Sequence, residues 1–181
     1  MKEIALHIMD IAENGIRAGA DTITIAIMEE GAPAELKIRV EDDGKGMSEE
    51  ELRQVADPFF TSRTTRRVGL GIPLLRQHAE MAGGKVKIQS ESGVGTMVEA
   101  SFLKDHPDRQ PLGDVEGCWM LLASSNPGIE WVLDIKTGAG DFSISTSEIR
   151  LAMEIEVISG NELLGQLKRM IRNNMDELGL V

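Results

Sequence analysis

The chain has 181 residues, enough for one domain, or for one domain of about 100 residues with a smaller second unit. Its hydrophobic fraction of 41% favours a packed core over disorder, and its formal net charge of −11 disfavours a nucleic-acid binder with a broad basic face. The single cysteine excludes an intramolecular disulfide framework, and no apolar run approaches the roughly 20 residues that span a bilayer. These features predict a cytoplasmic protein that contacts neither nucleic acid nor membrane.

The N-terminal region is predicted to form a helix over residues 2–18, which ends at Gly19. Isoleucines at helical spacing form one apolar stripe on it. The opposite stripe carries polar side chains at steps of three, four and three residues: His7, Asp10, Asn14 and Arg17. This spacing places the four polar side chains on one face of the helix.

A hairpin is predicted next, because residues 21–28 and 36–40 alternate strictly between apolar and polar side chains. The second strand runs into an Asp-Asp-Gly-Lys-Gly-Met segment at 42–47. Ser48 is then suited to cap a short helix.

The following residues form a basic island in an acidic chain, because no Asp or Glu occurs between Asp57 and Glu80. The island indicates either a small anionic ligand such as phosphate or a solvated loop. Within it, the Gly-Leu-Gly segment at 69–71 is expected to open a helix, and strands are expected around 86–88 and at 96–103.

The last third of the chain has a different organisation. Residues 105–115 have the composition of a linker, and residues 116–181 are predicted to form a small α+β unit of unknown role. Its expected strands lie at 118–124, 131–136 and 142–145, and its expected helices at 147–154 and 161–178.

Four local patterns follow one another along residues 3–103. They are the polar helix face ending at Asn14 and Arg17, the 42–47 segment, the 69–71 segment and the Gly-Val-Gly-Thr segment at 93–96. In this order they resemble the sequence boxes of the GHKL ATP-binding superfamily, which includes DNA gyrase B, heat-shock chaperone ATPases, histidine kinases and mismatch-repair ATPases. The Asp-Pro-Phe-Phe-Thr segment at 57–61 is similar to the F box of histidine kinases.

The resemblance implies a two-layer α/β sandwich of the Bergerat type, with helices on one face of a mixed sheet, over residues 1–104. It also implies that ATP and Mg²⁺ are the ligands. The ATP-binding residues that match the family pattern are Asn14, Arg17, Asp42, Gly44, Gly46, Met47, Arg67, Gly69, Leu70, Gly71 and Thr96.

Individual roles follow from the resemblance and from the chemistry of the side chains. The neutral carboxamide oxygen of Asn14 is suited to coordinate Mg²⁺, and Arg17 is suited to reach a phosphate. Asp42 matches the family aspartate that accepts a hydrogen bond from the adenine amino group. Gly69 and Gly71 open a helix whose N-terminus favours phosphate. Arg67 stands where the family commonly has a glycine, so it either adds a phosphate contact or stiffens the loop.

Asp10 is the candidate catalytic residue, because it lies one turn before Asn14, where gyrase-like ATPases carry a glutamate as general base. The alternative is a carboxylate that only orders metal-bound water or pairs with His7. None of the three histidines has the sequence context of a family phosphoacceptor, which favours transfer of phosphate to a separate protein.

Three functions therefore stay open. The first is a histidine-kinase-like protein that phosphorylates a partner, the second a slow ATPase that acts as a conformational switch, and the third a nucleotide sensor without turnover. The partner protein is unidentified, and a redox-enzyme or transcription-regulator system is one candidate source.

Overall fold

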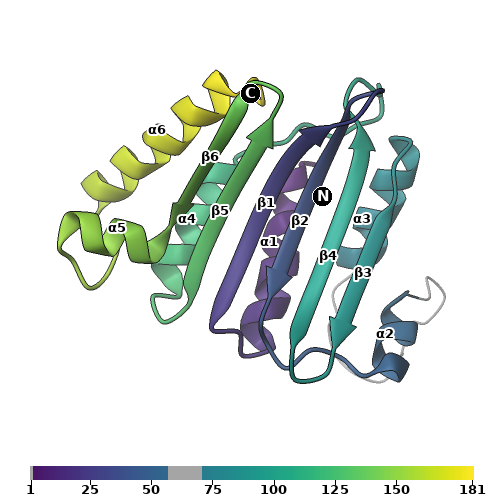
Figure 1. The fold of residues 1–181 in the computed structure, drawn as a ribbon, viewed down its shortest axis with the longest axis horizontal. Helices are drawn as coiled ribbons and strands as arrows, with labels where there is room; N and C mark the ends of the chain where they lie inside the picture. Colours follow the sequence, from purple (N-terminus) through teal and green to yellow (C-terminus); the bar gives the residue numbers. More distant parts are fainter. Residues whose placement is uncertain (1, 57–70) are drawn as a thin grey trace.

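The computed structural model describes residues 2–56 and 71–181 (Figure 1). Its helices are α1 (Ile4–Arg17), α2 (Glu49–Ala56), α3 (Gly71–Met81), α4 (Val115–Ser125), α5 (Thr146–Met153) and α6 (Asn161–Glu177). Its strands are β1 (Thr22–Glu30), β2 (Glu35–Asp42), β3 (Val86–Glu91), β4 (Gly95–Leu103), β5 (Glu130–Thr137) and β6 (Gly140–Ser145).

The strands form one mixed six-stranded sheet in the order β3-β4-β2-β1-β5-β6 (Figure 1). The pairings β1–β2, β2–β4, β3–β4 and β5–β6 are antiparallel, whereas β1 pairs with β5 in parallel, with Thr22 opposite Glu130. The C-terminal strands therefore extend the sheet of the N-terminal half. The division into 1–104, 105–115 and 116–181 as separate units stays a prediction.

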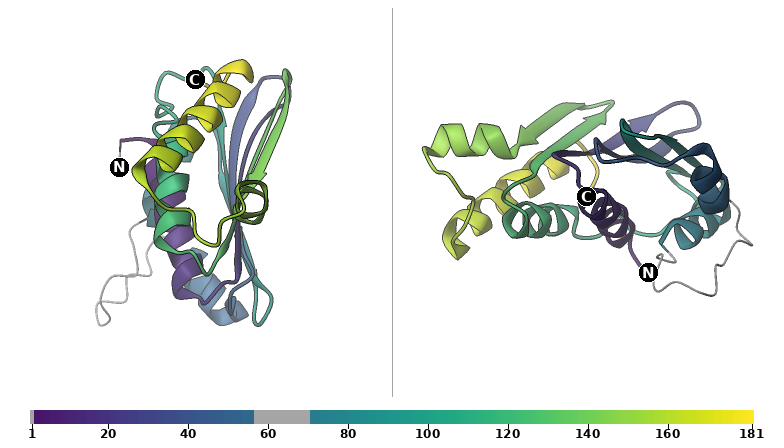
Figure 2. Two further views of the ribbon diagram at one scale, coloured as in Figure 1. Left: turned by 90° about the vertical axis from the view of Figure 1, so that its left-hand side faces the viewer. Right: turned by 90° about the horizontal axis from the view of Figure 1, so that it is seen from below.

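Four helices, α1, α3, α4 and α6, lie against one face of the sheet (Figure 2). Strand β1 alternates as the sequence predicted, and its Ile23, Ile25 and Ile27 are fully buried. The two-layer α/β sandwich with helices on one face is thus confirmed. Among residues 2–56 and 71–181, no helix combines the length and apolar character needed to cross a bilayer.

The expected strand at 118–124 is wrong, because these residues lie in helix α4. Asp114 caps this helix, and its side chain accepts a hydrogen bond from the backbone N–H of Gly117 at 2.9 Å. The helix packs against both α1 and α6 and fully buries Trp119. A helix enclosed in this way is apolar on several sides and lacks the period of an amphipathic helix.

The segment expected to be a linker is attached to the start of α1. The backbone N–H groups of Ile4 and Ala5 donate to the carbonyl oxygens of Pro111 and Leu112 at 3.0 and 2.9 Å. The first N–H groups of a helix have no partner within the helix, so these bonds satisfy two of them. The path between the two halves of the chain therefore runs over the N-terminus of α1.

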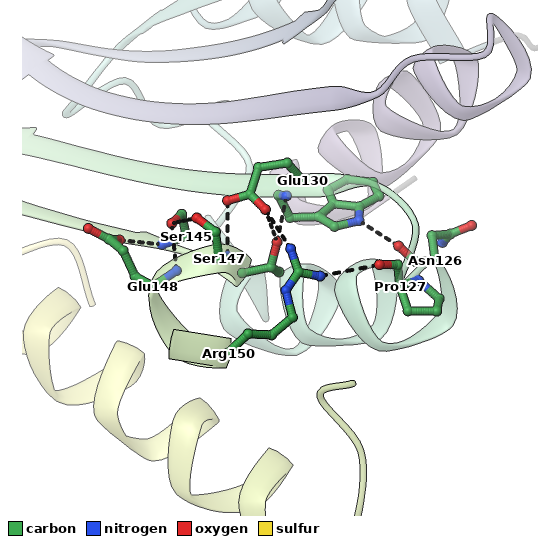
Figure 3. A network of polar contacts seen from close by, with 9 residues as sticks. Asn126, Pro127, Glu130, Ser145, Ser147, Glu148 and Arg150 are labelled. Atoms are coloured by element: carbon green, nitrogen blue, oxygen red, sulfur yellow. Dashed lines mark hydrogen bonds and ion pairs between the residues drawn. The ribbon is translucent and has the colours of Figure 1, made fainter. Parts of the chain in front are cut away.

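The start of β5 is joined to the start of α5 by a network around Glu130 (Figure 3). The Glu130 carboxylate accepts hydrogen bonds from the Thr146 hydroxyl at 2.8 Å, the Ser147 backbone N–H at 3.0 Å and the Arg150 guanidinium at 2.9 Å. Partial burial alone would raise the pKa of Glu130, but the bonds from Ser147 and Thr146 and the charge of Arg150 lower it. The network fixes α5 to the edge of the sheet.

Candidate functional site

The polar face of α1 opens into a small cavity beside the start of α3. Asp10, Asn14 and Arg17 line this cavity together with Gly71 and Ile72, and its volume is about 150 Å³. Because these three α1 side chains are spaced by one turn, the helix presents them in a row. We call this site the α1–α3 cavity.

Within the cavity, Asn14 is held by its neighbour on the helix. The Arg17 guanidinium donates to the Asn14 carboxamide oxygen at 2.6 Å and to the Glu13 carboxylate at 3.3 Å. Both Asn14 and Arg17 are exposed. The oxygen that would bind a metal ion therefore already faces a positive charge, which a cation would replace.

Asp10 lies directly against the first residue of α3. A Cβ atom built on Gly71 would stand 2.8 Å from Oδ2 and 3.2 Å from Cβ of Asp10, so a larger residue there would push the Asp10 carboxylate out of this position. The N-terminus of a helix carries partial positive charge. Asp10 is thus a half-exposed carboxylate at a helix N-terminus, with one edge in the cavity.

Asp42 ends strand β2 and is half-buried. Its Oδ1 accepts a hydrogen bond from the backbone N–H of Gly44 at 3.0 Å. Burial raises the pKa of the Asp42 carboxyl above its ordinary value, and the Gly44 bond only partly opposes this effect. The Thr96 backbone also donates to this carboxyl group. A partly desolvated carboxylate has several acceptor positions and is suited to a ligand that donates hydrogen bonds.

Gly15 connects the α1–α3 cavity to Asp42, although the sequence did not single it out. A Cβ atom on Gly15 would stand 2.9 Å from the Cβ atom of Asp42. Gly15 also follows Asn14 in the chain. The two groups of site residues therefore meet where α1 passes the end of β2.

The loop after Asp42 approaches the backbone of its neighbours. Gly46 has a φ of +61°, and a Cβ atom there would collide with the carbonyl oxygen of Glu91. A Cβ atom on Gly44 would stand 2.7 Å from that of Ala18. The glycines of this segment are therefore needed for close packing within the protein, whether or not they also contact a ligand.

Met47 and Thr96 are both tied to Ser90, a residue that sequence reasoning missed. The Ser90 hydroxyl accepts from the Met47 backbone N–H and lies 2.8 Å from the Thr96 hydroxyl. Thr96 stands opposite Asp42 in the pairing of β2 with β4. Ser90 thus links the backbone of Met47 to Thr96, which stands opposite Asp42, and no motif in the sequence marks Ser90.

Arg67, Gly69 and Leu70 fall outside the residues that the structure describes, and so does the 57–61 segment. Their assignment to the ATP site stays a prediction. The described site therefore consists of the α1–α3 cavity, the Asp42 segment and the strand residues beside it.

The buried His7 lies on the same stripe of α1 but points at other partners. Its Nε2 is 3.0 Å from Nδ1 of His78 and 3.2 Å from Oε1 of Gln110. Burial, reinforced by the charge of His78, lowers the pKa of His7 to about 4. No hydrogen bond between His7 and Asp10 occurs among the described residues, so the expected alternative pairing of these two side chains is not found.

The oxygen atoms that line the α1–α3 cavity fit a magnesium ion that completes its coordination shell with groups from outside the protein. The cavity offers the carboxamide oxygen of Asn14, which is a hard oxygen ligand, and the carboxylate of Asp10 lies one turn away, where it is suited to accept hydrogen bonds from metal-bound water. In the part of the chain that the structure describes, no three His, Cys, Asp or Glu side chains form a cluster able to hold a metal. Mg²⁺ commonly uses one or two protein oxygens together with phosphates and water.

Comparison with known proteins agrees with this geometry. Residues 2–106 match the family model for histidine kinase-, DNA gyrase B- and HSP90-like ATPases. The chain is 31% identical over 91 residues to sporulation kinase C of Bacillus subtilis, covering 50% of this chain and 21% of the relative. It is 32% identical over 98 residues to the sensor histidine kinase ZraS of Klebsiella oxytoca, covering 54% and 20%. The chain thus spans about a fifth of the length of these relatives.

Among solved structures, the Aquifex aeolicus MutL ATPase domain complexed with ADP superposes with a TM-score of 0.52. The superposition covers 86% of this chain and 70% of that one at 16% identity, which supports the fold alone. The family match includes more than half of the chain, with α1, the Asp42 segment and Thr96 inside it. The chain belongs to the histidine kinase-, DNA gyrase B- and HSP90-like ATPase family.

Proposed function

We propose that this protein binds Mg²⁺-ATP across the α1–α3 cavity and the Asp42 segment, and that it transfers the γ-phosphate to a separate protein. The observation that carries the proposal is the contact of Gly15 with Asp42. It brings an acceptor for the adenine amino group next to the helix face that carries Asn14 and Arg17.

Each residue has a role that its chemistry supports. The Asp42 carboxylate accepts a hydrogen bond from the adenine amino group. The Asn14 oxygen holds the metal ion, which supplies positive charge to the phosphates, and the Arg17 guanidinium leaves Asn14 to bind a phosphate oxygen. Gly71 lets the phosphates approach the N-terminus of α3.

A slow ATPase that acts as a conformational switch is the second candidate, because Asp10 lies at the cavity with its carboxylate against Gly71. In that position it is suited to take a proton from an attacking water molecule. A nucleotide sensor without turnover would use the same binding residues and leave Asp10 idle.

One assay with ATP labelled at the γ-phosphate separates these functions. We expect label on a second protein when purified candidate partners are added, with little free phosphate from the chain alone. Free phosphate without a labelled protein would favour the ATPase, and bound but intact ATP would favour the sensor. Equal affinity for ATP and GTP would contradict the role of Asp42, because guanine presents a carbonyl where adenine presents an amino group.

A further inference from the structure

Three polar side chains stand in one row across strands β3, β4 and β2, at the point where β2 ends. Ser90 is opposite Thr96, and Thr96 is opposite Asp42. Directly opposed residues of antiparallel strands point to the same face of a sheet, so the three side chains are neighbours. The next row on this face is apolar and consists of Ile88, Val98 and Val40. We call Ser90, Thr96 and Asp42 the polar row.

The Ser90 hydroxyl has a hydrogen-bond partner for its proton and for each of its lone pairs. It donates to the carbonyl oxygen of Gly95 at 2.9 Å and accepts from the backbone N–H of Met47 at 2.8 Å. The Thr96 hydroxyl oxygen lies 2.8 Å from it. The Gly95 carbonyl has no proton to give, so all three contacts form together only when the Ser90 proton goes to Gly95. The Thr96 proton then goes to Ser90.

The direction of this hydrogen bond decides what Thr96 can offer a ligand. Because its proton is committed to Ser90, the Thr96 oxygen can only accept a hydrogen bond from another group. The ionised carboxylate of Asp42, the next member of the polar row, is also an acceptor without a donor. The polar row therefore suits a ligand with N–H donors, such as the amino group of adenine.

We propose that Ser90 is a positioning residue of the nucleotide site, which acts through Thr96 and fixes its hydroxyl as an acceptor at the base end of that site. The proposal rests on the proposed binding of ATP and adds a residue to it. Asn14 and Arg17 line the α1–α3 cavity, where the phosphates are proposed to bind. A change at Ser90 should therefore alter recognition of the base and spare the contacts of the phosphates.

The variant Ser90→Ala removes the acceptor that holds the Thr96 proton. We expect it to lower the affinity for Mg²⁺-ATP at least fivefold, the size expected for one hydrogen bond. Its affinity for Mg²⁺-tripolyphosphate, which has no base, should change less than twofold. Displacement of a fluorescent ATP analogue measures both affinities in the full chain. Ser90→Thr retains a hydroxyl on the same carbon and should bind ATP within twofold of the wild type.

Ser101→Ala is the matched control for the loss of a serine hydroxyl. Ser101 also lies on β4 but outside the polar row, and its hydroxyl also accepts from a backbone N–H, that of Lys85 at 3.3 Å. The variant should bind ATP within twofold of the wild type, although Ser101 is more deeply buried than Ser90.

A mutant cycle tests whether Ser90 acts through Thr96. In a protein that already carries Thr96→Val, no threonine proton remains for Ser90 to hold. Adding Ser90→Ala to that protein should then lower ATP affinity less than twofold. The Met47 backbone loses its partner in either background, so its contribution appears equally in both arms of the cycle.

Two results would overturn the proposal. The first is a folded Ser90→Ala protein that binds ATP as the wild type does or that loses affinity for ATP and tripolyphosphate equally. The second is an undiminished effect of Ser90→Ala in the Thr96→Val background. If Ser90→Ala does not fold, Ser90→Cys replaces it, because sulfur occupies the same position and is a weak acceptor. A wild-type protein that does not bind ATP would overturn the proposed function as well, which separates the two failures.

Discussion

Gly15 and Asp42 are in contact across the junction of α1 and β2, and no side chain fits between them. A Cβ atom on Gly15 would lie 2.9 Å from Cβ of Asp42 and 3.0 Å from Cδ1 of Ile23. Ile23 is fully buried in β1 and has little room to shift, so Asp42 would have to move.

We expect Gly15→Ala to weaken ATP binding at least tenfold without removing any group that contacts the nucleotide. Overpacking of this kind costs about 1–3 kcal/mol, and displacement of Asp42 would misalign its carboxylate. Calorimetric titration with Mg²⁺-ATP measures the effect. Gly165→Ala is the control, because its new Cβ would meet only an arginine tip at 3.6 Å. Equal ATP affinity of the two variants would contradict the role of the contact.

Asn14→Asp should weaken Mg²⁺-ATP binding by about 30-fold to 1,000-fold, or about 2–4 kcal/mol. The new carboxylate adds negative charge beside the phosphates and would hold Arg17 more tightly than the carboxamide does at 2.6 Å. Glu13→Gln also removes a partner of Arg17, at 3.3 Å, and should bind ATP no more weakly than the wild type. A folded Asn14→Asp protein with affinity within threefold of the wild type would remove Asn14 from the metal site.

Asp10→Asn tests catalysis separately from binding. The amide is nearly isosteric and should keep its place against Gly71, so ATP affinity should change less than threefold. If Asp10 is the general base, single-turnover hydrolysis or transfer should fall about 100-fold or more. A fall below tenfold would limit Asp10 to ordering solvent. Asp141→Asn, an exposed site on β6, should leave both quantities unchanged.

His7 makes stability depend on pH. Its pKa is lowered from 6.5 to about 4 in the folded chain, chiefly by burial, so the folded state resists protonation. The contribution of neutral His7 to the free energy of unfolding is complete above about pH 6.5. It decreases progressively below that pH and is gone once the pH has fallen through about 4, a total loss of about 3 kcal/mol.

Urea unfolding between pH 7 and pH 4 measures this dependence. We expect His7→Gln to reduce the loss of stability on acidification, because glutamine does not titrate there. Identical pH profiles for His7→Gln and the wild type would show that His7 is not the titrating group.

The N-terminal fold could be predicted from the sequence because its signals are local. The alternation of apolar and polar residues in β1 and β2 predicted the hairpin. The one-turn spacing of Asp10, Asn14 and Arg17 predicted that they share one helix face, and this face lines the α1–α3 cavity. Helix α4 was misassigned because a short apolar run looks alike in a buried strand and in an enclosed helix. The cap at Asp114 was the signal that could have corrected it.

Other features depend on contacts between distant residues. In the sequence, Gly15 is only a weak helix former, and its importance comes from the contact with Asp42 at the end of β2. Ser90 is likewise an ordinary strand residue in the sequence, and its role comes from its hydrogen bonds to Met47 and Thr96. The parallel pairing of Thr22 with Glu130 joins residues separated by more than half of the chain. No local pattern encodes such a pairing.

The position of β1 in the middle of the sheet matters for anyone who shortens the chain. A fragment that ends at residue 104 would lack β5, so β1 would become an edge strand whose pairing groups from Thr22 to Met28 are left open. Such an edge, with isoleucine at every second position, is a template for self-association. The fragment would also lose the carbonyls of Pro111 and Leu112 that close the start of α1. Oligomers of that fragment would then be a product of the truncation, and the ATP-binding region is best studied with its C-terminal strands attached.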